Sequence, residues 1–117
     1  MSFDNQKDQL ITQLIRETIS GHVRWSARTP PYSLNQATES YVPLYLETTY
    51  KETRIGIYEI RDKHFTDVDE FYWAENLGFC IVLEPEVVVW QIEEYSPALK
   101  ELFNMARYHA SGISNLL

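Results

Sequence analysis

The sequence predicts an α+β fold, a five-stranded, mainly antiparallel sheet flanked by N- and C-terminal helices. Apolar residues recur at helical spacing near both ends of the chain, and the runs between them are rich in β-branched and aromatic residues. The clearest runs lie within residues 78–94 on either side of Glu84-Pro85-Glu86, a turn signal that indicates a β-hairpin. The length of 117 residues is typical of one domain. We therefore predict a single domain over residues 1–117 with the element order α-β-β-β-β-β-α.

The two helices have clear start and stop signals. The first is expected over residues 4–20, where Gly21 is placed just past its end. The second begins with Ser96 as the cap and Pro97 at the first helical position. Its apolar stripe continues to the end of the chain, and Gly112 inside it weakens the helix by about 1 kcal/mol relative to Ala.

The strands are read from alternation and from β-branched and aromatic content. We expect them over residues 22–28, 41–49 and 53–61 and in the two halves of the 78–94 hairpin. Pro43 lacks an N–H donor, which favours an edge position or the start of pairing. Residues 62–76 contain acids and aromatics without a clear period, and we interpret them as a loop with one helical turn near residues 67–71.

Charge and cysteine content restrict the partners and the compartment that we expect. The net charge is −7 and the ten basic residues are scattered, which disfavours nucleic acid and anionic membrane surfaces as partners. Cys80 is the single cysteine, lies in an expected strand and fits a reducing compartment. The first residues lack the pattern of a signal peptide, and no apolar run approaches the ~18 residues of a membrane helix. We expect a cytoplasmic protein.

Few residues suggest chemistry. His64, Asp67, Asp69 and Glu70 could line a small-molecule pocket near the acidic and aromatic loop Asp62–Asn76, although their spacing matches no metal motif. A solvated acidic loop is the simpler interpretation. The chain has neither a Gly-rich phosphate loop nor a nucleophile elbow. We predict no catalytic residue, no metal and no cofactor, and an enzyme or small-molecule-binding protein stays open as the alternative.

The aromatic residues are the more informative feature. Tyr and Trp are enriched at protein interfaces, and two helices can cover only one face of the sheet. The other face would carry Tyr41 and Tyr45, covered by a second subunit or a partner protein; alternatively, the sheet curls over itself and the aromatics form its core. We therefore predict a self-associating, non-enzymatic protein–protein interaction or regulatory module. The candidate interface residues are Tyr41, Tyr45, Tyr58, Trp73 and Trp90.

The packing residues also resemble those of a known group. The chain has a Gly21-(x)3-Trp25 step after an amphipathic helix, and Val-Val-Val-Trp-Gln-Ile over residues 87–92 before a Leu-x-x-Leu-Phe helix. This pattern is similar to that of small bacterial proteins of the domain-of-unknown-function type. The resemblance covers most of the chain, but it implies no activity and no functional residue.

Overall fold

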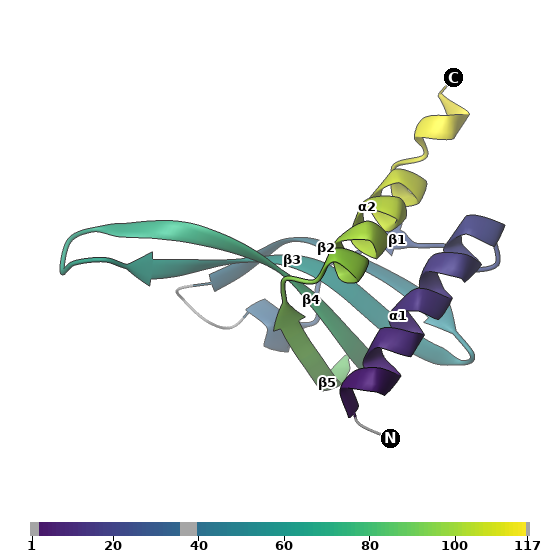
Figure 1. Ribbon diagram of the computed structural model, residues 1–117, viewed down its shortest axis with the longest axis horizontal. Helices are drawn as coiled ribbons and strands as arrows, with labels where there is room; N and C mark the ends of the chain where they lie inside the picture. The colour runs from purple at the N-terminus through teal and green to yellow at the C-terminus, as the bar shows by residue number, and fades with distance from the viewer. Residues whose placement is uncertain (1–2, 36–39, 117) are drawn as a thin grey trace.

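In the computed structural model, which describes residues 3–35 and 40–116, two long helices cover one face of a five-stranded antiparallel sheet (Figure 1). The strands follow in sequence order, each antiparallel to the one before it. This confirms the predicted α+β fold. The elements are α1 (Phe3–Ser20), β1 (Ser26–Ala27), η1 (Tyr32–Asn35), β2 (Ser40–Tyr50), β3 (Thr53–Phe65), β4 (Phe71–Leu83), β5 (Val87–Glu94), α2 (Pro97–Ser111) and η2 (Ile113–Asn115).

The main core lies between the helices and the sheet. Ile11 and Leu14 of α1 meet the stripe of α2 that carries Leu102, over the sheet residues Ile57 and Phe79. All five side chains are fully buried, and burying one such side chain contributes roughly 1.5–3 kcal/mol. The 3,4 spacing of the helices and the alternation of the strands bring these residues to one interface. The helical stripes identified in the sequence therefore pack on the sheet as expected.

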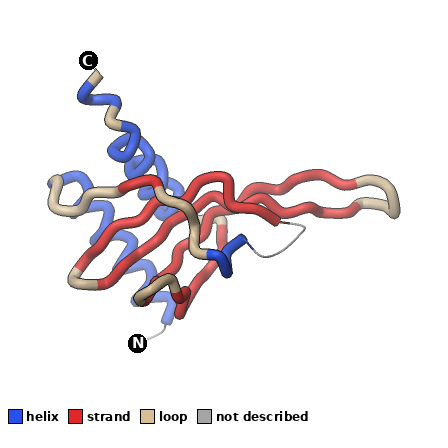
Figure 2. The backbone as a smooth tube through the Cα atoms, turned by 180° about the vertical axis from the view of Figure 1, so that it is seen from behind, coloured by secondary structure: helices blue, strands red, loops and turns tan. Residues whose placement is uncertain are grey.

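A second core lies on the opposite face of the sheet. Tyr45 and Tyr58 are 2% and 0% exposed there, and Leu34 of η1 packs with them. Figure 2 shows η1 and its flanking loop on this face, away from the two long helices. The expectation that Tyr45 lies on an uncovered face is wrong. Residues of the loop between β1 and β2 cover it, so the aromatics here are core of the single chain.

Glycines in neighbouring strands allow the two tyrosine rings to lie against the sheet. The Tyr45 ring sits over Gly56, and the Tyr58 ring sits over Gly78, its direct cross-strand partner. A Cβ atom at either glycine would overlap the ring. Strand glycines often mark such a close approach of another group to the backbone.

The helix ends follow local signals with one difference. Ser96 accepts a hydrogen bond from the Leu99 N–H, and Pro97 opens α2, as predicted. Gly21 takes a φ of +84° just past α1. Gly112 also has a positive φ, +68°, and stands at the C-cap of α2 rather than inside it. The helix therefore ends at Ser111, because a left-handed residue stops the α-helical ladder.

Two further predictions, one of a strand and one of a loop, were also wrong. The strand expected over residues 22–28 is reduced to two paired residues, although Val23 and Trp25 are buried. Residues 62–76 contain no helical turn: β3 and β4 continue through them as a paired hairpin that is closed by a turn over residues 66–70. Cross-strand pairing of aromatic residues stabilises this extension. The hairpin projects beyond both helices (Figures 1 and 2).

Candidate interaction surface

The projecting hairpin carries a row of aromatic side chains on one face. Phe65 pairs with Phe71 across the hairpin, and their ring centroids lie 5.9 Å apart. Trp73 stands edge-on to Phe71 at 6.1 Å and to Tyr41 of β2 at 5.3 Å. Because β-strand side chains alternate between faces, these residues share the face on which the helices pack farther along the sheet. We call Tyr41, Phe65, Phe71 and Trp73 the aromatic strip.

The aromatic strip is exposed on the single chain. Its four side chains retain 37%, 55%, 47% and 44% of their accessible surface in the order Tyr41, Phe65, Phe71 and Trp73. At roughly 200 Å² per aromatic side chain, this amounts to about 350 Å² of mainly apolar surface. Apolar patches of roughly 300–600 Å² are the largest that typical monomers expose, and they are often functional.

Two cations lie on the aromatic strip. The Lys63 ammonium is 4.5 Å from the centroid of the Phe71 ring and 5.4 Å from that of Trp73. Arg61 lies over the Tyr41 ring at 5.8 Å and donates a hydrogen bond of 2.9 Å to the Tyr41 hydroxyl. Cation–π contacts at exposed sites contribute about 0.5–1 kcal/mol each. These contacts restrain the rings, which nevertheless stay partly exposed.

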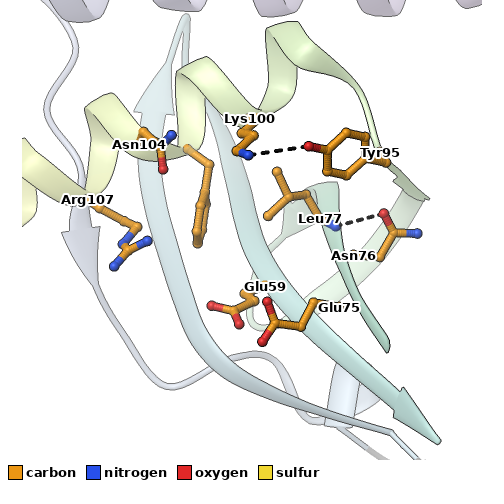
Figure 3. A pocket seen from close by; sticks show the side chains of 9 residues that line it. Glu59, Glu75, Asn76, Leu77, Tyr95, Lys100, Asn104 and Arg107 are labelled. Atoms are coloured by element: carbon orange, nitrogen blue, oxygen red, sulfur yellow. Dashed lines mark hydrogen bonds between the residues drawn. The ribbon is translucent and has the colours of Figure 1, made fainter. Parts of the chain in front are cut away.

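At the base of the hairpin, a cleft of about 170 Å³ separates the sheet from α2 (Figure 3). Arg61 links it to the aromatic strip through ion pairs of 3.1 Å with Glu59 and with Glu75. Figure 3 shows Lys100, Asn104 and Arg107 on the α2 side and the two glutamates on the sheet side. The lining residues are Glu59, Glu75, Asn76, Leu77, Tyr95, Lys100, Phe103, Asn104 and Arg107.

The second core contains a buried polar network. Glu47 is 5% exposed, accepts hydrogen bonds from Arg28, Arg54 and Tyr45, and sits opposite Gly56. Burial alone would raise the pKa of Glu47, but the hydrogen bonds and charges of its partners outweigh burial and lower it. Burial raises the pKa of Tyr45 above its usual range. The Glu47 carboxylate is therefore satisfied by partners within the chain.

Cys80 is inert in this setting. Its side chain is fully buried in the second core, and burial raises the pKa of its thiol to about 12. A thiol with so high a pKa is not a thiolate at neutral pH and is a poor nucleophile. Cys80 therefore packs as a small apolar residue of the second core.

The five candidate interface residues differ in how far they are exposed. Tyr41 and Trp73 are exposed and in contact in the aromatic strip. Tyr45 and Tyr58 are buried, and Tyr58 donates a hydrogen bond of 3.0 Å to Glu93. Trp90 is half-buried and packs edge-on to Phe79 of the main core at 5.8 Å.

Sequence reasoning missed Lys63, Phe65 and Phe71. Phe65 on one side of a polar turn and the successive aromatics of Phe71-Tyr-Trp73 on the other are the signals that could have revealed the hairpin. They are weak because each half is short. Each half can be recognised as a strand only when its pairing with the other half is known.

The four candidate pocket residues lie at the tip of the hairpin. His64 stacks on Tyr72 at 5.5 Å, on the face opposite the aromatic strip. The backbones of Asp67 and Glu70 are joined in the turn, and Asp69 lies between them. All four side chains are exposed, and the cleft beside α2 is lined by other residues.

Comparisons with known proteins identify no family for this chain. No family model matches the chain, and curated proteins and solved structures gave no significant match either. Among residues 3–35 and 40–116, no group of three or more His, Cys, Asp or Glu side chains is arranged to hold a metal ion. No helix in this part of the chain has the length and apolar character needed to cross a bilayer.

Proposed function

We propose that this chain is a non-enzymatic protein–protein interaction module that self-associates through the β3–β4 hairpin. The observation that carries the proposal is the aromatic strip, in which three rings of the projecting hairpin and the Tyr41 ring of β2 stay 37–55% exposed. Burying part of this apolar surface on each copy contributes about 25 cal/mol per Å², which opposes an entropic cost of association of roughly 4–15 kcal/mol. Self-association of moderate affinity is the expected result.

Three further observations support a binding role rather than catalysis. The buried titratable groups of the second core, Tyr45, Glu47 and Tyr58, are hydrogen-bonded in structural pairs. The buried Cys80 thiol has a raised pKa, so it lacks the activation that a nucleophile requires. The exposed aromatic strip lies on a hairpin that is paired along its length and on the adjoining β2, and aromatic side chains bind with little loss of conformational entropy. A cytosolic regulatory or accessory role fits the single cysteine and the acidic composition.

The test is the solution mass by light scattering, measured over a wide range of protein concentrations. Wild-type protein should be dimeric at high concentration, and Trp73→Glu should be a folded monomer because it places a charge among the rings. Tyr32→Glu is the matched control, since Tyr32 is an aromatic residue with 80% exposure on η1, away from the strip. A monomeric wild type, or equal masses for Trp73→Glu and wild type, would refute self-association through this surface.

A further inference from the structure

We infer that self-association occurs by strand pairing: the outer edge of β4 over Phe71–Asn76 pairs antiparallel with the same segment of a second copy across a twofold axis. The inference rests on the proposed function and specifies its geometry. It predicts a continuous sheet through two hairpins, with strand order β3, β4, the partner's β4 and the partner's β3.

The outer edge of β4 is open along the projecting hairpin. Phe71–Asn76 pair with β3 on one side. On the other side, the pairing with β5 ends at Leu77, opposite Glu94. After Glu94 the chain leaves the sheet to start α2, so no strand in the described part of the chain continues β5 along the hairpin. An open edge presents backbone N–H and C=O groups, which is a template for another strand.

This edge lacks the usual protections against pairing. Its sequence, Phe-Tyr-Trp-Ala-Glu-Asn, has no proline, one charge and three successive aromatic residues, and its register with β3 is regular throughout. The free edge of β5 is different: the register shifts between Ile81 and Val82, which leaves Val89 as an extra residue, and the strand ends in two glutamates. Bulges and charges block edge pairing. The β4 edge is therefore the better pairing surface.

Charge complementarity favours a second copy as the occupant. In an antiparallel arrangement the tip of one hairpin points toward the base of the other, where α2 lies. The tip carries three exposed carboxylates, those of Asp67, Asp69 and Glu70. At the base, the cleft beside the end of the open edge is lined by Lys100 and Arg107 of α2 and by two glutamates, Glu59 and Glu75, which are ion-paired with Arg61 (Figure 3). Twofold symmetry forms this contact twice.

The same symmetry also gathers the aromatic strips. A twofold axis between antiparallel neighbours stands perpendicular to the sheet, so both strips lie on one face of the joined sheet. Residues that share a face must pair, so one residue of the segment lies opposite its own copy. The middle of the open edge is Trp73 and Ala74. Pairing centred on Trp73 places the Trp73 rings of the two copies opposite each other and each Phe71 ring opposite the partner's Glu75.

A cysteine scan over residues 71–76 tests the geometry. Each variant keeps Cys80, which is fully buried. Opposed residues in an antiparallel pair have Cα atoms about 4.5–5.5 Å apart, within reach of a disulfide. We expect one position, Trp73→Cys or Ala74→Cys, to form a dimer linked by a disulfide under mild oxidation far more efficiently than the others. Tyr32→Cys measures random collision. Ala74→Cys is a small change and should retain the wild-type mass before oxidation.

The outcomes separate the two claims. If the wild type is dimeric and one position on the edge cross-links, the inference holds. If the wild type is dimeric but no position exceeds the Tyr32→Cys control, edge pairing is overturned while self-association stands. Face-to-face stacking of the strips would give this second result, because stacked sheets lie about 10 Å apart. If the wild type is monomeric, both claims fail.

A charge exchange tests the contact between tip and base. Lys100→Glu/Arg107→Glu should weaken the dimer, and so should Asp67→Lys/Asp69→Lys. An equimolar mixture of the two variants should form a heterodimer. In the heterodimer the changed base of one variant meets the changed tip of the other, and the two unchanged regions meet at the second contact, so both contacts join opposite charges. A mixture that stays as weakly associated as either variant alone would overturn the assigned antiparallel contact.

Discussion

The packing of Tyr58 on Gly78 makes a quantitative prediction for Gly78→Ala. The added Cβ would lie 2.6 Å from Cε1 of Tyr58 and closer still to its Cε2 and Cζ atoms. Tyr58 is fully buried, and its hydroxyl donates a hydrogen bond of 3.0 Å to Glu93, so the ring cannot move aside without losing that bond. The clash must therefore be relieved by displacing a fixed ring or the sheet itself.

The expected cost follows from these contacts. Overpacking a core costs about 1–3 kcal/mol, and the hydrogen bond to the Glu93 carboxylate contributes about 1.5–3 kcal/mol. Against this, Ala lowers the entropy of the unfolded chain and stabilises by about 0.4–1 kcal/mol where φ is negative. We expect Gly78→Ala to reduce the free energy of unfolding by about 2–4 kcal/mol. The measurement is urea unfolding followed by tryptophan fluorescence, with an unchanged slope.

The control is a double-mutant cycle with Tyr58→Leu, which removes the ring atoms that meet the Cβ. In that background Gly78→Ala should be neutral or stabilising by up to about 1 kcal/mol. An equal cost in both backgrounds would refute the reasoning, because the ring would then not be the cause. No loss of stability in the wild-type background would refute it as well.

Three further predictions concern the second core and the end of α2. The pKa of Glu47 is lowered on folding, so the stability that it contributes is complete above the ordinary pKa of about 4.5 and is lost as the pH falls through the lower folded value. Glu47→Gln should therefore cost about 1–3 kcal/mol at pH 7 and flatten the loss of stability in acid, measured by urea unfolding at several pH values; parallel pH curves would contradict this. Cys80 should react with a thiol reagent only on unfolding, and rapid labelling of the native protein would show that its site is open. Gly112→Ala should destabilise by about 1 kcal/mol because the φ of Gly112 is +68°, whereas a stabilising effect of similar size would place this residue inside the helix.

The sequence by itself determined the features that depend on local interactions. The bounds of α1, the Ser96 cap and the turn between β4 and β5 all follow from residues within one or two turns of each other. Periodicity identified the helix stripes that form the main core, since the pattern of a helix lies within its own residues. These features gave the fold class and element order correctly.

Only the tertiary structure decided which strand faces are covered and how far the strands extend. From the sequence, Tyr45 and Tyr58 were expected at an interface. In the structure, each ring lies on a glycine of another strand and is buried in the second core with Leu34 from the loop between β1 and β2. The hairpin through Phe71 was missed because its two halves stabilise each other across the turn. The aromatic strip joins β2, β3 and β4, and cross-strand contacts between residues far apart in sequence depend on a register that only folding establishes.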